Sequence, residues 1–151
     1  MARRLSLARA ELGMDVALLS EIADDREVVR AAAGAVDSLG VRPGASAAMR
    51  DTVCERVLAG RVAGVIGDLA GERAVRDRAS VRDTGARSYL GVPLTTEDAR
   101  LYMLCCLSRE VRPDLGPEDL AFLQGVAEAV KAALDEDDAS DPYAYLRDLH
   151  D

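Results

Sequence analysis

Hydrophobic residues recur at intervals of three and four at both ends of the chain, a spacing typical of amphipathic helices. The first run lies within residues 1–13 and ends at Gly13, a residue type that commonly stops a helix. The second begins at Pro117, a favoured first helical residue, and its apolar positions are Leu120, Leu123, Val126, Ala127, Val130 and Leu134. We therefore predict one helix at each end, the second ending at Leu134.

Short apolar runs bounded by turn residues lie between these helices and predict β-strands. Five runs fit this description, at residues 15–21, 27–33, 62–66, 87–94 and 101–108. The first two and the last two are each joined by a polar turn, which predicts two hairpins. Both strands of the last pair are apolar on both faces, so we expect other layers of the protein to cover them on both sides.

The middle of the chain carries one further predicted helix, at residues 52–60, with Asp51 as its N-cap. Residues 34–50 contain glycines and a proline and predict a long loop that has room for a short helical turn. Residues 71–83 are rich in arginine and aspartate, which indicates a solvated surface segment or a lid over a pocket. Asp68 is expected to cap the segment that follows it rather than to act as a catalytic acid.

This order of elements predicts an α+β fold with a mostly antiparallel sheet of about five to six strands. The terminal helices are expected to pack on one face of the sheet. The middle helix and the loops are expected to cover the other face, leaving a pocket beneath them. Residues 1–135 then form a single domain, and residues 136–151 form an acidic, flexible tail.

Charge and composition narrow the classes of partner. The net charge is −8 and aromatic residues make up 3%, which argues against nucleic acid or an anionic membrane surface as a partner. No signal peptide or membrane-spanning run is recognisable. Three cysteines, two of them adjacent, do not suggest a disulfide framework. We expect a cytoplasmic protein, and the heavy use of alanine, arginine, glycine and valine suggests a bacterial source.

Five sequence pieces, in this order, resemble the GAF family, above all bacterial GAF domains found beside cyclic-di-GMP signalling modules. They are GMDVALLSE at 13–21, DTVCERVLAGR at 51–61, VIGD at 65–68, SYLGVPL at 88–94 and LYMLCCLS at 101–108. The resemblance implies a sensor fold whose pocket lies between the sheet and the middle helix and loops. Family members bind cyclic nucleotides, bilins, haem, small metabolites or no known ligand, and many dimerise through their terminal helices.

Six residues are candidates for the pocket: Ser20, Thr52, Cys54, Arg87, Tyr89 and Gly91. Tyr89 and Gly91 share one face of their strand, where the tyrosine offers a ring and a hydroxyl. Ser20 and Thr52 offer polar groups, and Arg87 offers a charge for an anionic group. Each of them is equally compatible with a purely structural role.

Cys54 is the most interesting single residue. It lies in the first turn of the predicted helix, where free amides can stabilise a thiolate and lower the thiol pKa. It is therefore a candidate redox-sensitive thiol or pocket contact, although a small buried side chain packing with Leu58 is the favoured interpretation. Cys105 and Cys106 point to opposite faces of one strand, and core packing is again favoured.

Patterns for catalysis, metals and chromophores are missing from the expected domain. The only histidine is His150, and no CxxC or HExxH spacing is present. The resemblance implies that a bilin site needs a histidine beside its cysteine, whereas Glu55 follows Cys54. We therefore expect no catalytic residues, no metal and no cofactor.

The leading hypothesis is a stand-alone sensory or regulatory domain, not an enzyme, that binds an undefined small ligand. It would signal by association with a protein partner or as a homodimer through its terminal helices, whose apolar seam could equally pack on its own sheet. One alternative is a protein-interaction module without a ligand. The other is a thiol-based redox sensor, or an enzyme like the methionine-sulfoxide reductases of the family, that uses Cys54.

Overall fold

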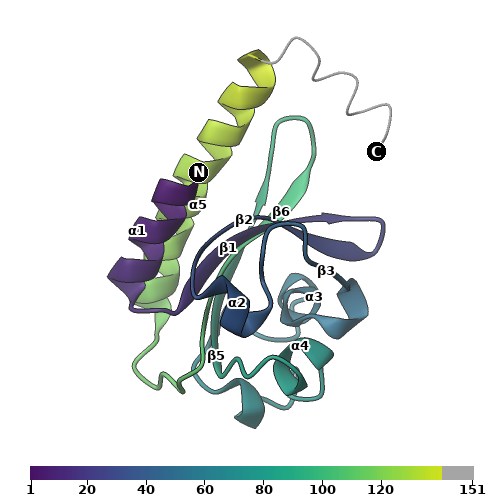
Figure 1. The fold of residues 1–151 in the computed structure, drawn as a ribbon, viewed down its shortest axis with the longest axis vertical. Coiled ribbons are helices and arrows are strands. Elements are labelled where there is room, and N and C mark those ends of the chain that lie inside the picture. Colours follow the sequence, from purple (N-terminus) through teal and green to yellow (C-terminus); the bar gives the residue numbers. More distant parts are fainter. Residues whose placement is uncertain (141–151) are drawn as a thin grey trace.

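A six-stranded antiparallel sheet forms the centre of the fold, in the order β3-β2-β1-β6-β5-β4 (Figure 1). The computed structural model describes residues 1–140. The strands are β1 Val16–Ala23, β2 Arg26–Gly34, β3 Ser46–Ala48, β4 Val65–Ile66, β5 Ser88–Thr95 and β6 Leu101–Ser108. The helices are α1 Ala2–Leu12, α2 Val36–Leu39, α3 Val53–Leu58, α4 Ala79–Arg82 and α5 Pro117–Ser140, with 3₁₀ turns η1 Met49–Asp51 and η2 Leu69–Gly71. The predicted α+β class is confirmed.

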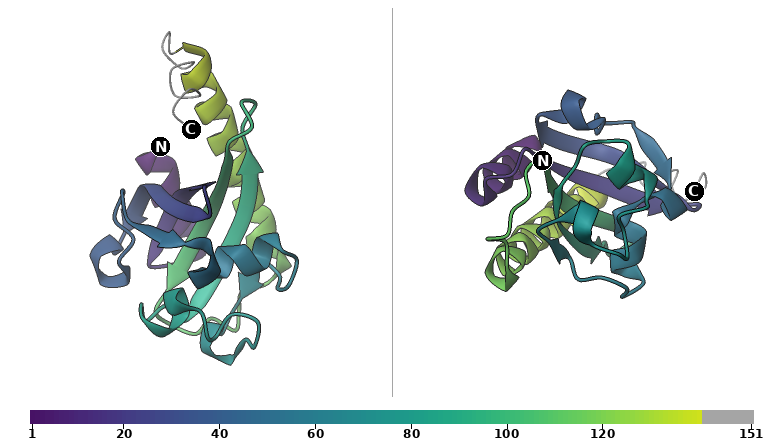
Figure 2. Two further views of the ribbon diagram at one scale, coloured as in Figure 1. Left: turned by 90° about the vertical axis from the view of Figure 1, so that its right-hand side faces the viewer. Right: turned by 90° about the horizontal axis from the view of Figure 1, so that it is seen from below.

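The terminal helices α1 and α5 lie side by side against one face of the sheet (Figures 1 and 2). Leu5 of α1 is buried there, as are Leu123, Ala127 and Val130 of α5. These three α5 residues belong to the apolar seam that was a candidate dimer interface. The seam therefore packs on its own sheet, and these positions are not available to a second copy.

The last helix is longer than predicted. α5 continues to Ser140, past the expected end at Leu134. The intervening residues, Asp-Glu-Asp-Asp-Ala, contain no glycine or proline that would stop a helix. The tail predicted over residues 136–151 thus begins as helix, and its remainder lies outside the described residues. None of the helices within residues 1–140 is both long enough and apolar enough to cross a bilayer.

The other face of the sheet is covered by α2, α3, α4 and the loops between them (Figure 2). A second apolar core lies here and includes Leu18 of β1, Leu39 of α2 and Val53 of α3. Cys105 faces this core, whereas its neighbour Cys106 faces the terminal helices. The predicted arrangement of layers is therefore confirmed.

A bulge in β2 decides which of its residues face the second core. Ser20 of β1 pairs with Val29, but Leu19 pairs with Ala31, so Arg30 is an extra residue in β2. Because of it, Val29 and Glu27 face the second core, while Ala31 packs on the helix side. Without the bulge, strict alternation would place all three on one face.

Two details of the middle region differ from the prediction. The segment expected to be a loop contains the edge strand β3, which was not predicted, whereas the short helix α2 is the helical turn for which the prediction left room. The N-cap of α3 is Thr52 and not Asp51, because the Thr52 hydroxyl accepts a hydrogen bond from the amide of Glu55. Asp68 caps η2 by accepting from the amide of Gly71, as predicted.

Candidate ligand-binding pocket

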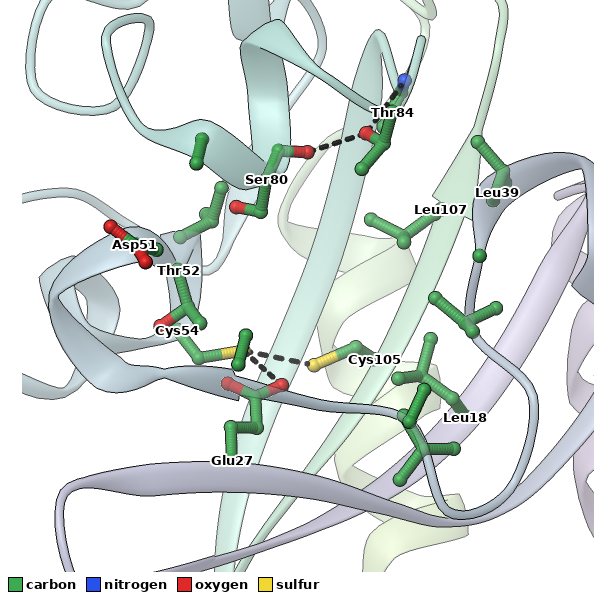
Figure 3. Close-up of a pocket in the computed structure, with 18 of the residues that line it drawn as sticks. Leu18, Glu27, Leu39, Asp51, Thr52, Cys54, Ser80, Thr84, Cys105 and Leu107 are labelled. Atoms are coloured by element: carbon green, nitrogen blue, oxygen red, sulfur yellow. Dashed lines mark hydrogen bonds between the residues drawn. The ribbon is translucent and has the colours of Figure 1, made fainter.

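A cavity of about 540 Å³ lies on the face of the sheet opposite α1 and α5. Leu18, Val29 and Leu107 line it from three neighbouring strands, and Leu39 of α2 and Leu69 of η2 add to its apolar wall. The volume is in the range of pockets that hold small molecules. Figure 3 shows Leu18, Leu39 and Leu107 on one side of the cavity, opposite Thr52, Cys54 and Ser80.

The arginine- and aspartate-rich segment forms another part of the wall. Ala79, Ser80 and Asp83 come from the end of this segment, so part of it covers the pocket. Arg78 ties the segment to α3, since its Nη2 lies 3.1 Å from Glu55 Oε2. Its guanidinium also donates to a backbone carbonyl of η1. The wall is therefore connected to the helix beside it by an ion pair and a hydrogen bond.

Cys54, Cys105 and Glu27 meet at the inner end of the cavity (Figure 3), and the Tyr89 hydroxyl joins them there. The Cys54 sulfur lies 3.2 Å from the Tyr89 hydroxyl, 3.4 Å from the Cys105 sulfur and 3.6 Å from Glu27 Oε2. The Tyr89 hydroxyl is also 3.5 Å from the Cys105 sulfur. Four elements, α3, β5, β6 and β2, thus each contribute one polar or polarisable group to the same place.

Glu27 is the one carboxyl group in this cluster. Within residues 1–140 it makes no ion pair, and its Oε1 and the nearby Ser20 hydroxyl are buried without a hydrogen-bond partner. Burial raises the pKa of Glu27, although Cys54, Ser20 and Thr52 partly oppose the shift. Glu27 was not among the candidates from the sequence.

The pKa of Cys54 differs from the expectation. The contact with Cys105, burial and the charge of Glu27 together raise it well above its usual value. The lower pKa expected from the helix start is not found, because Cys54 is buried beside Cys105 and Glu27. The expected packing with Leu58 is also wrong, since Leu58 is 37% exposed and Cys54 packs against the sheet.

The structure explains why position 91 is a glycine. A Cβ atom built at this position would lie 2.1 Å from the Tyr89 hydroxyl, far inside van der Waals contact. The Tyr89 side chain therefore lies along its own strand over Gly91, and its hydroxyl reaches Cys105, the residue that pairs with Gly91. Gly91 does not line the cavity itself but permits the position of Tyr89.

Of the remaining candidates, one lines the cavity and two do not. Thr52 lines the cavity, but its hydroxyl already donates to Met49 O and accepts from the Glu55 amide. Ser20 is fully buried on the pocket side of β1, behind the lining residues. Arg87 is outside the lining and donates to the neighbouring carbonyl of Ala86. The structure thus brings Thr52, Cys54 and Tyr89 to the cavity wall.

The described residues offer no obvious metal site. Among residues 1–140, no group of three or more histidine, cysteine, aspartate or glutamate side chains is placed to hold a metal ion. The inner cluster instead combines two thiols, a phenol and a carboxyl group next to an apolar wall. Such a site can contact an apolar molecule and hydrogen-bond a polar group on it.

Comparison with solved structures shows the same fold in several proteins. The GAF domain of PixJ from Thermosynechococcus elongatus superposes with a TM-score of 0.71 at 15% identity, over 89% of this chain and 82% of that chain. The GAF domain of an Acinetobacter phosphoenolpyruvate-protein phosphotransferase gives 0.68 at 14% identity, over 91% and 81%. Free methionine-R-sulfoxide reductase from Neisseria meningitidis, in complex with its substrate, gives 0.65 at 16% identity, over 87% and 73%.

At these identities the similarity establishes the fold and leaves the ligand open. No match was found among curated proteins. The sequence profile of the GAF domain, however, matches residues 2–134, which include the whole sheet and most of α5. The chain belongs to the GAF domain family.

Proposed function

We propose that this protein is a sensory or regulatory GAF domain of the bacterial cytoplasm that binds a small molecule in the cavity between β1, β2, β6 and the α3–α4 region. The observation that carries the proposal is the cavity itself, which is about 540 Å³ in volume and lined by aliphatic side chains with polar groups at one end. A pure interaction module with a filled interior would have no such space. The position also agrees with the pocket that the family resemblance implies.

Ligand binding here has a route to the rest of the molecule. Val29 and Leu107 line the cavity, and each lies on a strand that also packs on the opposite side against the terminal helices. A ligand that shifts these strands would alter the packing of α1 and α5. We propose that the signal leaves the domain through these helices, to a partner protein or a second copy.

Native mass spectrometry of the protein purified from its native host tests this proposal. We expect the wild-type protein to retain a small molecule. Ala79 lines the cavity, so Ala79→Phe should fill part of it and reduce retention. Ala70→Phe is the matched control, because Ala70 is exposed on η2 and lies outside the lining.

Two results would contradict the proposal. The first is a wild-type protein that carries no molecule and gains no thermal stability from host metabolite extract. The second is equal retention by the wild-type protein and Ala79→Phe, which would place the ligand outside the cavity.

A second candidate function, thiol redox chemistry, is favoured by the distance of 3.4 Å between the Cys54 and Cys105 sulfur atoms. The sequence hypothesis considered Cys54 without this partner. A hydroperoxide or a sulfoxide would oxidise the pair: the two thiols lose two protons and two electrons and form one S–S bond, while the oxidant is reduced to an alcohol or thioether and water is released. The raised pKa of Cys54 makes this reaction slow at neutral pH, because the thiolate is the nucleophile.

The test is intact mass after exposure to hydrogen peroxide or to free methionine sulfoxide. We expect the loss of two hydrogen atoms in the wild-type protein and in Cys106→Ser, because Cys106 faces the opposite side of the sheet. Cys105→Ser should show no such loss. Persistence of the free thiols in the wild-type protein, or the same mass loss in Cys105→Ser, would exclude this function.

A further inference from the structure

The inner end of the cavity carries a carboxyl group, that of Glu27, which makes no ion pair within residues 1–140. Glu27 lines the cavity, and its Oε2 accepts a weak hydrogen bond from Cys54. Its Oε1 is buried with no partner within residues 1–140. A buried carboxylate without a cation is unfavourable, and proteins usually supply one or place the group in water.

The arginine residues that line the cavity do not supply a positive charge to the Glu27 carboxylate. Arg26 and Arg50 line the cavity, but both are exposed, so they lie at its mouth. Arg26 donates to the Ser46 hydroxyl, and neither guanidinium forms an ion pair with Glu27. The inner end of the cavity is therefore acidic, whereas the positive charges of Arg26 and Arg50 are exposed to solvent at its mouth.

This distribution discriminates between classes of ligand. An anionic group at the inner end would face the Glu27 carboxylate and would be repelled. A neutral hydroxyl would satisfy one oxygen without balancing its charge. An ammonium group would do both, since it donates up to three hydrogen bonds and carries the missing positive charge.

The apolar wall defines the rest of the ligand. Leu18, Leu39 and Leu107 face the same space as Glu27 (Figure 3), and Val29 lines the same cavity. Resting on the proposed ligand-binding function, we propose that the pocket selects a small amine with an apolar body, whose ammonium group pairs with Glu27 and whose body lies against these side chains. The anionic ligand suggested by Arg87 is not part of this proposal, because Arg87 lies outside the cavity lining.

Three probes that share one body test the inference: 4-phenylbutylamine, 4-phenylbutanol and 4-phenylbutyrate. Their dissociation constants are measured by NMR titration with the full chain at neutral pH. We expect the amine to bind at least about tenfold more tightly than the carboxylate, with the alcohol between them. A difference of this size is expected from one charge contact with Glu27 that solvent does not screen.

Two variants separate recognition by Glu27 from a general charge effect. Glu27→Gln removes the charge with little change in shape and should abolish the preference for the amine. Asp83→Asn removes the same charge from the exposed part of the lining and should leave the preference intact. Thermal unfolding of both variants shows whether they remain folded.

Three results of these titrations would contradict the pairing of an amine with Glu27. Equal binding of amine and carboxylate, an amine preference that survives Glu27→Gln, or no binding by any of the three probes would overturn it. In all three cases the proposed sensor function would still stand if the host-purified protein retains a molecule. Loss of that retained molecule in Ala79→Phe but not in Glu27→Gln would likewise show a ligand site that does not use Glu27.

Discussion

Tyr89 and Gly91 show how one residue can determine the chemistry of a site through another. The alternation of residues places both on one face of their strand, and in the structure Cys105 and the cavity lie on this face. The alternation does not reveal that Tyr89 lies over Gly91, where a Cβ atom would meet its hydroxyl at 2.1 Å. Side-chain direction within a face depends on tertiary packing, so this contact was not predictable from spacing alone.

Gly91→Ala is therefore expected to destabilise the fold by about 1–3 kcal/mol, because Tyr89 must move out of a buried position. Urea unfolding measures the change. Gly125→Ala is the control, since Gly125 is exposed in α5 with open space around it, and alanine there should stabilise the helix by about 0.5–1 kcal/mol. A neutral Gly91→Ala would contradict the position of Tyr89.

Glu27 should make the stability depend on pH. Its pKa in the folded protein is raised above the ordinary 4.5, so the folded state holds this proton more tightly than the unfolded state. This contribution is fully present below pH 4.5 and is lost as the pH rises through the raised pKa. Cys54 and Tyr89, which face Glu27 or its neighbours, have raised pKa values and stay neutral in this window.

Glu27→Gln should accordingly be more stable than the wild-type protein at pH 8, and its advantage should shrink as the pH falls towards 4.5. Chemical unfolding across this range gives the comparison. A constant difference between the two proteins at all pH values would contradict a desolvated carboxyl at position 27.

At the scale of elements, the sequence was most informative where hydrophobic patterns were long and regular. The terminal helices and both hairpins were predicted because their periodicity extends over several residues. Glu27 was missed for the opposite reason. The bulge at Arg30 breaks the alternation of β2. Strict alternation would place Glu27 on the same face as Ala31 and Ala33, whereas these two alanines pack on the helix side of the sheet.

The short elements of the middle region are set by single hydrogen bonds, which composition does not reveal. Both Asp51 and Thr52 are good N-cap residues, and only the backbone of η1 selects Thr52. Thr52→Ala should cost about 1 kcal/mol of unfolding free energy, whereas Thr52→Ser should keep most of it. Asp51→Ala is the matched control and should have little effect. A larger loss in Asp51→Ala would restore Asp51 as the cap.

For the whole molecule, the order of elements identified the fold, and the resemblance of five sequence pieces identified the family. Association could not be derived in this way, because the same apolar seam serves either a dimer or the protein's own core. The structure uses it for the core. Leu7 of α1 and Phe122 of α5 remain exposed, at 62% and 41%.

A dimer through the terminal helices would have to bury these two residues. Sedimentation equilibrium should then show a dimer for the wild-type protein and a monomer for Phe122→Asp. Val111→Asp changes an equally apolar exposed residue that lies before α5 and should leave the dimer intact. A wild-type monomer, or a dimer that survives both Leu7→Asp and Phe122→Asp, would contradict this interface.

The cavity in front of Glu27 is the proposed ligand site, and both the sensory function and the preference for an amine depend on it. Methyl NMR spectra recorded while host metabolite extract is added test it most directly, because both cores are rich in aliphatic residues. We expect shifts for the methyl groups of Leu18, Val29, Leu39 and Leu107, with those of Leu5 and Leu123 changing less. Shifts confined to the core beneath α1 and α5, or none at all, would contradict this ligand site.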